Sequence, residues 1–345
     1  MRVAIDSGPL NSGDSIRGIG FHTKELVNEL SKLQDENFKL DVVDFSKTNL
    51  SKYDIVHYQY FRPHALTLPF RKPAKKVIVT IHDLIRLIYP NAYPAGIKGW
   101  IRFQIQKFNL RNVDAIITIS ETSKKDIVRF LNIPPEKIHV IYLAPQTSFK
   151  SSDELLRKQE LPKQFVLYVG DVNYNKNLIN LAKACKLAKL KLVMVGKQAG
   201  VENNKQSLSL RDNIENEPWR EFLRLYKNDR DIIRLGFVDD LSEIYKRATV
   251  YCQPSLYEGF GLQLLEAFEH GTPVAAGRAQ VLVEVGGDAC LYFNPKDPKD
   301  MADKLKTVIN NKKLASELVK KGKERLKNFS WKKTAQETLD VYGKI

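Results

Sequence analysis

The sequence predicts an α/β protein with two doubly wound parallel sheets, one in each of two domains. Two observations support this prediction. Short apolar runs of strand length alternate with helical segments, and one polar stretch with two prolines, Ala144–Lys163, interrupts the alternation. The length of 345 residues is sufficient for two domains of ordinary size, each with its own core.

The strand candidates are short, and several end at polar residues or glycine. In the first half they are Arg2–Asp6, Lys39–Val43, Ile55–Tyr58, Val77–Ile81, Asp114–Ser120 and Ile138–Leu143. In the second half they are Phe165–Val169, Lys191–Val195, Ile232–Phe237 and Val250–Cys252, with further apolar segments at Thr272–Ala276 and Cys290–Phe293. Ser330 is the expected N-cap of a final helix over Trp331–Tyr342.

The composition is typical of a soluble globular protein that stays in the cytosol. The hydrophobic fraction is 43%, and the longest apolar runs are far too short to span a membrane. The start, MRVAIDSGPL, indicates a strand and a turn rather than a secretion signal. The three widely spaced cysteines, Cys185, Cys252 and Cys290, are expected to be buried reduced thiols without a metal.

The net charge of +15 is the unusual feature of the composition. Such a charge is compatible with nucleic acid, an anionic membrane surface or acidic substrates, and also with a plain solvated surface. The segment Gly99–Arg111 is both amphipathic and basic. A helix there could lie on a membrane or pack on the core with its charges in water, and both alternatives stay open.

Candidate ligand residues follow several strands. His82 comes directly after Val77–Ile81, and His57 is a weaker candidate at the preceding strand. Open α/β sheets place ligand groups at the carboxyl ends of their strands. Lys176 follows Phe165–Val169 and a glycine turn, where it could neutralise a diphosphate or be an exposed turn lysine. A glycine-rich loop with Gly8, Gly13, Gly18 and Gly20 follows the first strand, and is as compatible with a plain turn as with a phosphate.

The stretch Pro254–Gly271, PSLYEGFGLQLLEAFEHG, is the most informative part of the sequence. Glu258 precedes the turn Gly259-Phe260-Gly261, and Glu266 lies eight positions later inside a short predicted helix. Glycines let a backbone approach a ligand closely, and the N–H groups of a helix start favour an anion. A phosphate at Gly261-Leu262 would then have one carboxylate on either side, which is the layout of a sugar nucleotide. Alone, the pattern would more simply indicate a loop–helix corner with two solvated glutamates.

The segment SLYEGFGLQLLEAFEHGTPVAA resembles the signature of retaining glycosyltransferases of family 4. The resemblance extends in order through RGIGFHTKEL, TIHDL, ITISETSKKDI, YVGDVNYNKNL, RLGFVDDLSEIYKRATVYCQPS and EVGGDACLYFNPKDP. It implies the GT-B fold, in which two Rossmann-like domains face each other across a cleft. The implied parts are an acceptor-side domain at 1–155, a nucleotide-sugar domain at 156–326 and a C-terminal helix at 327–345 that packs back on the first domain.

The resemblance also implies roles for individual residues. Glu266 would hold the ribose hydroxyls of the donor, and Glu258 the hydroxyls of the transferred sugar. Lys176 would neutralise the distal phosphate, and His82 would sit near the reacting carbon. The donor-binding backbone would comprise Gly259, the N–H groups of Phe260, Gly261 and Leu262, and a flexible loop formed by Gly18 and Gly20. One departure concerns Asn175, which stands where the family usually has arginine; Arg17 or Arg278 could supply the missing cation.

The expected activity is retaining, metal-independent transfer of a hexose, with mannose as a candidate, from a nucleoside-diphosphate sugar. The acceptor would be a saccharide or a lipid-linked saccharide. No Asp-x-Asp pair stands in a convincing metal position, so no metal or other cofactor is expected. The location would be cytoplasmic, with peripheral association at the anionic inner face of the membrane as an option, and nucleic acid is an unlikely partner. The alternatives are an epimerase or phosphorylase of the same fold, or a basic binding protein without catalysis.

Overall fold

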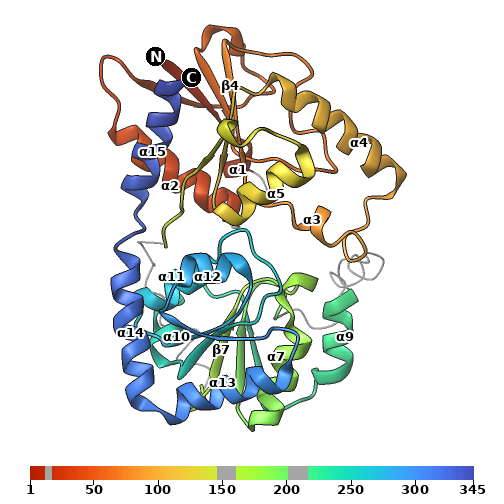
Figure 1. Ribbon diagram of the computed structural model, residues 1–345, viewed down its shortest axis with the longest axis vertical. Helices are drawn as coiled ribbons and strands as arrows, with labels where there is room; N and C mark the ends of the chain where they lie inside the picture. Colours follow the sequence, from red (N-terminus) through yellow and green to blue (C-terminus); the bar gives the residue numbers. More distant parts are fainter. Residues whose placement is uncertain (12–17, 146–160, 201–216) are drawn as a thin grey trace. The chain divides into compact units, whose positions relative to one another are not determined.

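The structure, a computed structural model, describes residues 1–11, 18–145, 161–200 and 217–345. The chain forms two compact units (Figure 1). Unit 1 comprises residues 1–144 and 329–345, and unit 2 comprises residues 145–328. The boundary expected between residues 155 and 156, together with Gly13 and Arg17, lies outside the described residues.

Unit 1 contains a parallel sheet of six strands in the order β2-β1-β3-β4-β5-β6. The strands are β1 (Arg2–Asp6), β2 (Lys39–Val43), β3 (Ile55–Tyr58), β4 (Lys76–Ile81), β5 (Ala115–Thr118) and β6 (Ile138–Val140). Strand β1 lies between β2 and β3, so the direction of winding reverses there. Helices cover both faces of the sheet, which explains why β4 and β5 are almost entirely buried.

Two of the described helices of unit 1 begin at a serine N-cap. They are α1 (Gly8–Asn11), α2 (Gly18–Lys32), α3 (Ile85–Ile88), α4 (Gly96–Asn109), α5 (Glu121–Leu131) and α15 (Trp331–Lys344), with short 3₁₀ turns η1 (Leu50–Lys52), η2 (Leu110–Asn112) and η3 (Pro135–Lys137). The Ser120 and Ser330 side chains cap α5 and α15 by accepting hydrogen bonds from backbone N–H groups. The C-terminal helix α15 packs beside α2, where the rings of Phe21 and Trp331 lie 5.6 Å apart (Figure 1).

Unit 2 contains a second parallel sheet of six strands in the order β12-β11-β10-β7-β8-β9. The strands are β7 (Val166–Val169), β8 (Leu192–Val195), β9 (Ile232–Gly236), β10 (Val250–Gln253), β11 (Val274–Gly277) and β12 (Cys290–Phe293). The winding direction reverses between β7 and β10, which pair directly. Open α/β sheets bind their ligands outside the carboxyl ends of the strands at such a reversal.

The helices of unit 2 cover its sheet in the same manner. They are α7 (Leu178–Ala188), α9 (Glu217–Tyr226), α10 (Ser242–Arg247), α11 (Leu262–Glu269), α12 (Gln280–Gly286), α13 (Pro298–Asn310) and α14 (Lys312–Leu326), with the 3₁₀ turn η4 (Tyr174–Lys176). The fold class predicted from the sequence, two doubly wound parallel sheets, is therefore confirmed. Cys185, Cys252 and Cys290 are buried free thiols, as expected.

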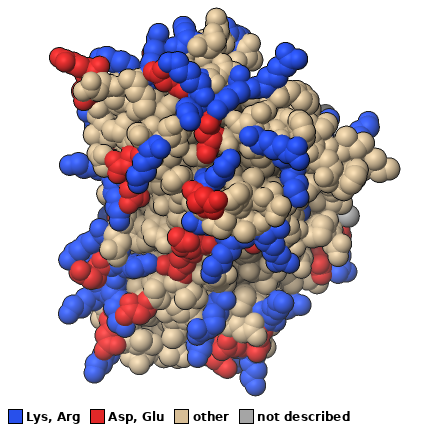
Figure 2. Space-filling view, turned by 45° about the horizontal axis from the view of Figure 1, so that its top comes forward, with Lys and Arg blue, Asp and Glu red and all other residues tan. Residues whose placement is uncertain are grey.

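Charged side chains are spread over the surface. Figure 2 shows Lys and Arg side chains scattered over the visible face, with fewer Asp and Glu side chains between them. Among the described helices, none combines the length and the apolar character that a bilayer span requires.

Candidate active site

Lys176 and Glu258 form an ion pair at the point where the sheet of unit 2 reverses its winding. Lys176 lies in η4, after the carboxyl end of β7, and Glu258 follows the neighbouring strand β10. The Lys176 Nζ lies 2.7 Å and 2.9 Å from the two carboxylate oxygens of Glu258. The two side chains are only 15% and 8% exposed. A site with one shielded cation and one shielded carboxylate thus lies where the fold places ligands.

The Glu258 carboxylate is held by further donors. Its Oε1 accepts hydrogen bonds from the Gln253 Nε2 at 2.8 Å and the Ser255 Oγ at 2.6 Å, in addition to Lys176. Lys176 also donates to Oε2. A carboxylate oxygen has two lone-pair directions, so Oε2 has the greater remaining capacity for a substrate hydroxyl. Glu258 is therefore held mainly through Oε1, and Oε2, which accepts from Lys176 alone among the side chains, has capacity for one more hydrogen bond.

Asn175, which stands where the resemblance implies an arginine, positions the loop that carries Glu258. Its buried side chain donates from Nδ2 to the Tyr257 carbonyl oxygen at 3.0 Å. The backbone N–H of Leu256 donates to the Asn175 carbonyl oxygen at 2.8 Å. Of the two arginines considered as substitutes, Arg278 has its guanidinium over the Tyr292 ring at 5.5 Å, and Arg17 lies outside the described residues.

Helix α11 begins at Gly261, directly after the Glu258 loop. Gly261 has φ +106°, in the left-handed region, and a Cβ atom there would come within 2.9 Å of Leu282 Cδ2. The positive φ is the main reason for glycine here, since the end of the Leu282 side chain could shift. Gly261 offers no side-chain cap to the start of the helix, and the N–H groups of a helix start favour an anion. The expected inner face of this helix, Leu264, Leu265 and Phe268, is buried.

Glu266 lies one turn further along α11 and has a different environment from Glu258. The Tyr245 hydroxyl donates to its Oε2 at 2.9 Å. Burial of the carboxyl raises the Glu266 pKa to about 7, although the tyrosine hydrogen bond opposes this shift. Near neutral pH the side chain therefore exists as a mixture of acid and carboxylate. The sequence pattern did not indicate Tyr245 as a partner of Glu266.

In unit 1, His82 forms a pair with a second histidine. His82 follows β4, and its Nε2 lies 3.0 Å from the Nδ1 of His22 in α2. The Ser123 hydroxyl donates to the His82 carbonyl oxygen at 2.9 Å. Burial lowers the His82 pKa to about 4, and burial together with the neighbouring imidazole lowers the His22 pKa well below its usual value. Both rings are neutral at pH 7, and one donates its N–H to the other.

His57, the weaker candidate, belongs to the packing of unit 1. It is fully buried in β3, with Nδ1 2.7 Å from the Tyr342 hydroxyl of α15 and Nε2 2.8 Å from Thr80 Oγ1. Burial lowers the His57 pKa to about 3. The Nδ1 contact connects β3 to α15, and the Nε2 contact connects β3 to β4 within the sheet.

The expectation that Gly18 and Gly20 form a loop was wrong. Both residues lie in the first turn of α2, which begins at Gly18. The helix extends this far because Gly20 and His22 are already buried, and the His22 ring packs 6.0 Å from the Trp331 ring of α15. Packing against a helix from the far end of the sequence thus overrides the local preference of glycine.

The structure therefore collects Lys176, Glu258, Gly259–Leu262 and Glu266 in unit 2, and His82, Gly18 and Gly20 in unit 1. Sequence reasoning missed His22, Gln253 and Tyr245. Only His22 carried a signal, because it lies in the segment RGIGFHTKEL. Within the described ranges, no group of three or more His, Cys, Asp or Glu side chains could hold a metal ion.

Comparisons with known proteins point to one family. The family model described as "Glycosyl transferases group 1" matches residues 151–325, and "Glycosyltransferase Family 4" matches residues 38–147. O-antigen chain mannosyltransferase B of Escherichia coli is 27% identical over 305 residues, which are 84% of this chain and 75% of that protein. Serotype-specific mannosyltransferase WbdA of E. coli is 24% identical over 320 residues, 88% of this chain but only 38% of that protein.

Solved structures show the same fold at low sequence identity. Sucrose-phosphate synthase from Thermosynechococcus elongatus is 19% identical, with a TM-score of 0.74 over 100% of this chain and 98% of that one. Anabaena HepE in complex with UDP and glucose is 15% identical, with a TM-score of 0.73 over the full length of both chains. The match to the group 1 model extends over about half of the chain and includes the Lys176–Glu258 site. The chain therefore belongs to the glycosyl transferases group 1 family, and is a glycosyltransferase of family 4 type with the GT-B fold.

Proposed function

We propose that this enzyme transfers mannose, with retention at the anomeric carbon, from a nucleoside-diphosphate sugar to a saccharide acceptor. The observation that carries the proposal is the shielded Lys176–Glu258 pair beside the uncapped start of α11. Glu266 lies on the same helix and would receive the ribose hydroxyls. This arrangement offers a cation and backbone N–H groups to a diphosphate and one carboxylate to each of the two sugars.

The proposed chemistry follows from the charge that develops as the bond between the sugar and the nucleoside diphosphate breaks. Departure of the nucleoside diphosphate leaves negative charge on the distal phosphate and positive charge on the sugar ring. Lys176 and the N–H groups at Phe260, Gly261 and Leu262 would stabilise the phosphate, as an oxyanion hole does. Glu258, anchored through Oε1, would bind the sugar hydroxyls through Oε2. His82 would lie near the reacting carbon as a neutral hydrogen-bonding group.

Mannose is favoured because two relatives with long alignments are named mannosyltransferases. The base of the donor stays open, since the relatives' names state none and HepE was solved with UDP. We further propose that no metal is needed, because Lys176 would supply the positive charge at the phosphate. The acceptor would be a lipid-linked saccharide at the cytoplasmic membrane surface.

A thermal-shift screen with UDP-, GDP-, ADP- and TDP-sugars tests the donor site directly. One nucleotide class should stabilise the wild type, and mannose transfer with that donor should continue in EDTA. The anomeric configuration of the product, measured by NMR, then tests retention. Conversion of the donor without an acceptor would indicate an epimerase, and phosphate-dependent release of a sugar phosphate would indicate a phosphorylase. The absence of any nucleotide-sugar binding would refute the proposal.

A further inference from the structure

Helix α4 differs from an ordinary surface helix, because polar side chains make up much of its buried face, beside the partly buried Phe103 that packs against the core. Gln106 and Asn109 are 0% and 1% exposed. Gln106 accepts a hydrogen bond from the Leu68 backbone N–H at 3.1 Å and donates to Thr67 Oγ1 at 2.6 Å. Asn109 donates to the Leu68 carbonyl oxygen at 3.1 Å. Hydrogen bonds to the preceding loop therefore hold much of the inner face of this helix.

The outward face of α4 is mainly apolar instead, with the exposed Gln104 as a polar member. Ile97, Trp100, Ile101 and Phe108 are 81%, 59%, 47% and 57% exposed. Their spacing of three, four and seven residues places them along one side of the helix. Phe70, 63% exposed, lies beside the C-terminal end, because Asn112 of η2 donates to its carbonyl oxygen at 3.0 Å. We call these five side chains the α4 face, and an exposed apolar patch of this kind marks an interaction site.

Cations flank the α4 face on both sides. By helical geometry, Lys98 and Arg102 lie along one side and Lys107 along the other. The Arg111 guanidinium lies over the Phe108 ring at 4.9 Å. Between residues 55 and 113, ten Lys and Arg residues accompany a single carboxylate, Asp83, while Lys72 and Lys76 pair with Asp114 and Lys75 pairs with Asp54 just outside this range. The surface around α4 therefore combines an apolar strip with a strong local excess of positive charge.

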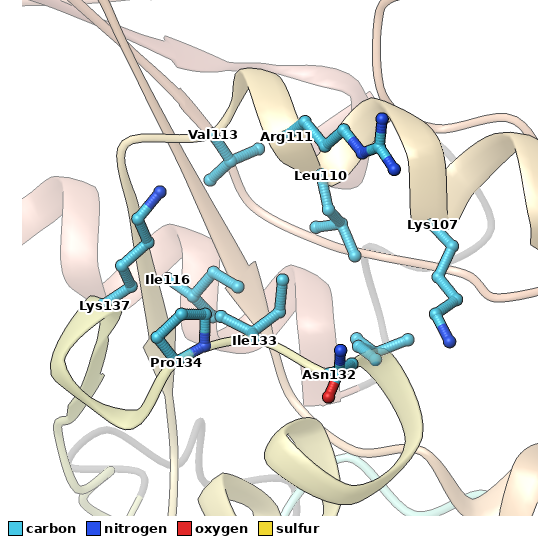
Figure 3. Close-up of a pocket in the computed structure, with 10 residues that line it drawn as sticks. Lys107, Leu110, Arg111, Val113, Ile116, Asn132, Ile133, Pro134 and Lys137 are labelled. Carbon is cyan, nitrogen blue, oxygen red and sulfur yellow. The ribbon is translucent and has the colours of Figure 1, made fainter.

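The C-terminal end of α4 borders a cavity of about 260 Å³ with the same combination. Figure 3 shows apolar side chains, including Leu110, Ile116 and Ile133, between Lys107 on one side and Lys137 on the other. Arg111 is the third cation among the ten residues that line the cavity, and none of these ten is acidic. The cavity suits a group that carries negative charge and apolar carbon together.

We propose that the α4 face docks on an anionic lipid bilayer. A strip of Trp, Phe and Ile between rows of Lys and Arg is the pattern of a helix that lies in the membrane interface. Apolar side chains would enter the acyl boundary while the cations meet acidic headgroups. A soluble protein partner would have to supply both a complementary apolar groove and many carboxylates, whereas an anionic bilayer offers both features along the whole strip.

The position of α4 connects this surface with the proposed function, on which this step rests. Helix α4 leads through η2 into the amino end of β5, so it runs antiparallel to the strands. Its first turn, with Ile97 and Trp100, is therefore at the carboxyl edge of the sheet, the edge that carries His82. Docking through the α4 face would hold this edge near lipid-linked acceptors.

Vesicle sedimentation with the full-length protein tests the proposal. The probes are phosphatidylcholine vesicles with and without phosphatidylglycerol, and wild type should bind only when the acidic lipid is present. The double variant Trp100→Ser/Phe108→Ser should lose about a hundredfold in partitioning, since each large apolar side chain contributes roughly tenfold. The matched control Leu187→Ser/Phe237→Ser removes side chains 56% and 51% exposed in unit 2, and should bind as wild type does.

Two double charge-reversal variants measure the electrostatic contribution to vesicle binding. Lys98→Glu/Arg102→Glu should lower binding by roughly 25-fold or more, because each cation near an acidic surface contributes about fivefold. The control Lys306→Glu/Lys313→Glu changes the net charge equally in unit 2 and should have a much smaller effect. Equal losses in both variants would overturn the proposal, as would binding that ignores the acidic lipid.

Two further readouts separate membrane docking from self-association and from a failure of the donor site. If the α4 face is an interface between copies, wild type will sediment as a dimer and Trp100→Ser/Phe108→Ser as a monomer, and this outcome rejects the membrane. Nucleotide-sugar binding by the same variant should equal that of wild type. If wild type binds vesicles but no nucleotide sugar, the membrane-docking proposal is supported and the proposed transferase function is rejected.

Discussion

The carboxyl edges of the two sheets have the same architecture, but one carries an ion pair and the other carries neutral rings. In unit 2 the edge carries the shielded charges of Lys176 and Glu258, which neutralise each other at 2.7 Å. In unit 1 the edge carries His82 and His22, which burial keeps uncharged. A charged edge suits a diphosphate, whereas neutral rings suit sugar hydroxyls. In the proposed reaction, two copies of one architecture would divide the chemistry through the burial and pairing of a few side chains.

The largest expected effect comes from removing charge at the edge of unit 2. Lys176→Met should lower kcat by about a thousandfold, because one preorganised group that stabilises a developing anion contributes this much. The control Lys186→Met removes a lysine that pairs with Asp229 and Asp231 away from the site, and should leave kcat unchanged. Steady-state kinetics with a sugar-nucleotide donor provide the measurement.

Glu258→Ala tests the other member of the pair and should abolish transfer while the protein stays folded, as judged by circular dichroism. Some loss of thermal stability is expected because Gln253, Ser255 and Lys176 all lose their acceptor. A fully active Glu258→Ala variant would remove the basis for placing the donor sugar at this edge.

The next effect should come from unit 1. His82→Ala should lower kcat by about a hundredfold if the neutral imidazole contacts the reacting sugar, within the usual range for a positioned catalytic side chain. Its thermal unfolding should change far less than its activity. His139→Ala, which alters a half-buried histidine of β6, is the control and should retain wild-type kinetics. If His82→Ala is as active as His139→Ala, then His82 does not take part in the reaction, and the residues that act on the donor lie in unit 2.

A smaller effect is expected in the pH dependence of donor binding. The Glu266 pKa is raised to about 7, so the carboxylate that would accept ribose hydroxyls becomes more populated as the pH rises from about 6 to about 8. Donor affinity, measured by calorimetry, should rise severalfold across this interval. In the free protein the raised pKa means that the folded state holds a proton that the unfolded state has lost. This contribution therefore destabilises the fold as the pH rises from about 4.5 to 7.

Glu266→Gln should remove both pH dependences, because the amide does not titrate. Retention of the affinity change in this variant would assign the titration to another group.

The smallest effect is expected from a change beside His57, the histidine that contributes to the packing of unit 1. Tyr342→Phe deletes the hydroxyl that lies 2.7 Å from His57 Nδ1 and should lower the free energy of unfolding by about 1 kcal/mol. Transfer activity should be unchanged, because the change affects the contact of α15 with the sheet. A large loss of activity without a loss of stability would show that His57 belongs to the site.

Much of this protein is determined by local patterns in its sequence. The strands were predictable because parallel strands covered on both faces require short continuous apolar runs. The Ser330 cap and the Gly259-Phe260-Gly261 turn were predictable because they depend on residue type and immediate neighbours. The ordered segments also indicated the family that the comparisons then showed.

Only the tertiary structure decided which side chains meet. Lys176 and Glu258 are 82 residues apart in sequence, and they pair because β7 and β10 are neighbours in the sheet. Likewise His22 meets His82 across 60 residues, and Gly18 begins a helix in which the buried His22 packs against Trp331 of α15. The amphipathic pattern of α4 did not reveal which side faces water, because Gln106 and Asn109 find buried partners in the loop beside them. Residue spacing records local periodicity, whereas charge pairing, pKa and exposure depend on neighbours that long-range packing brings together.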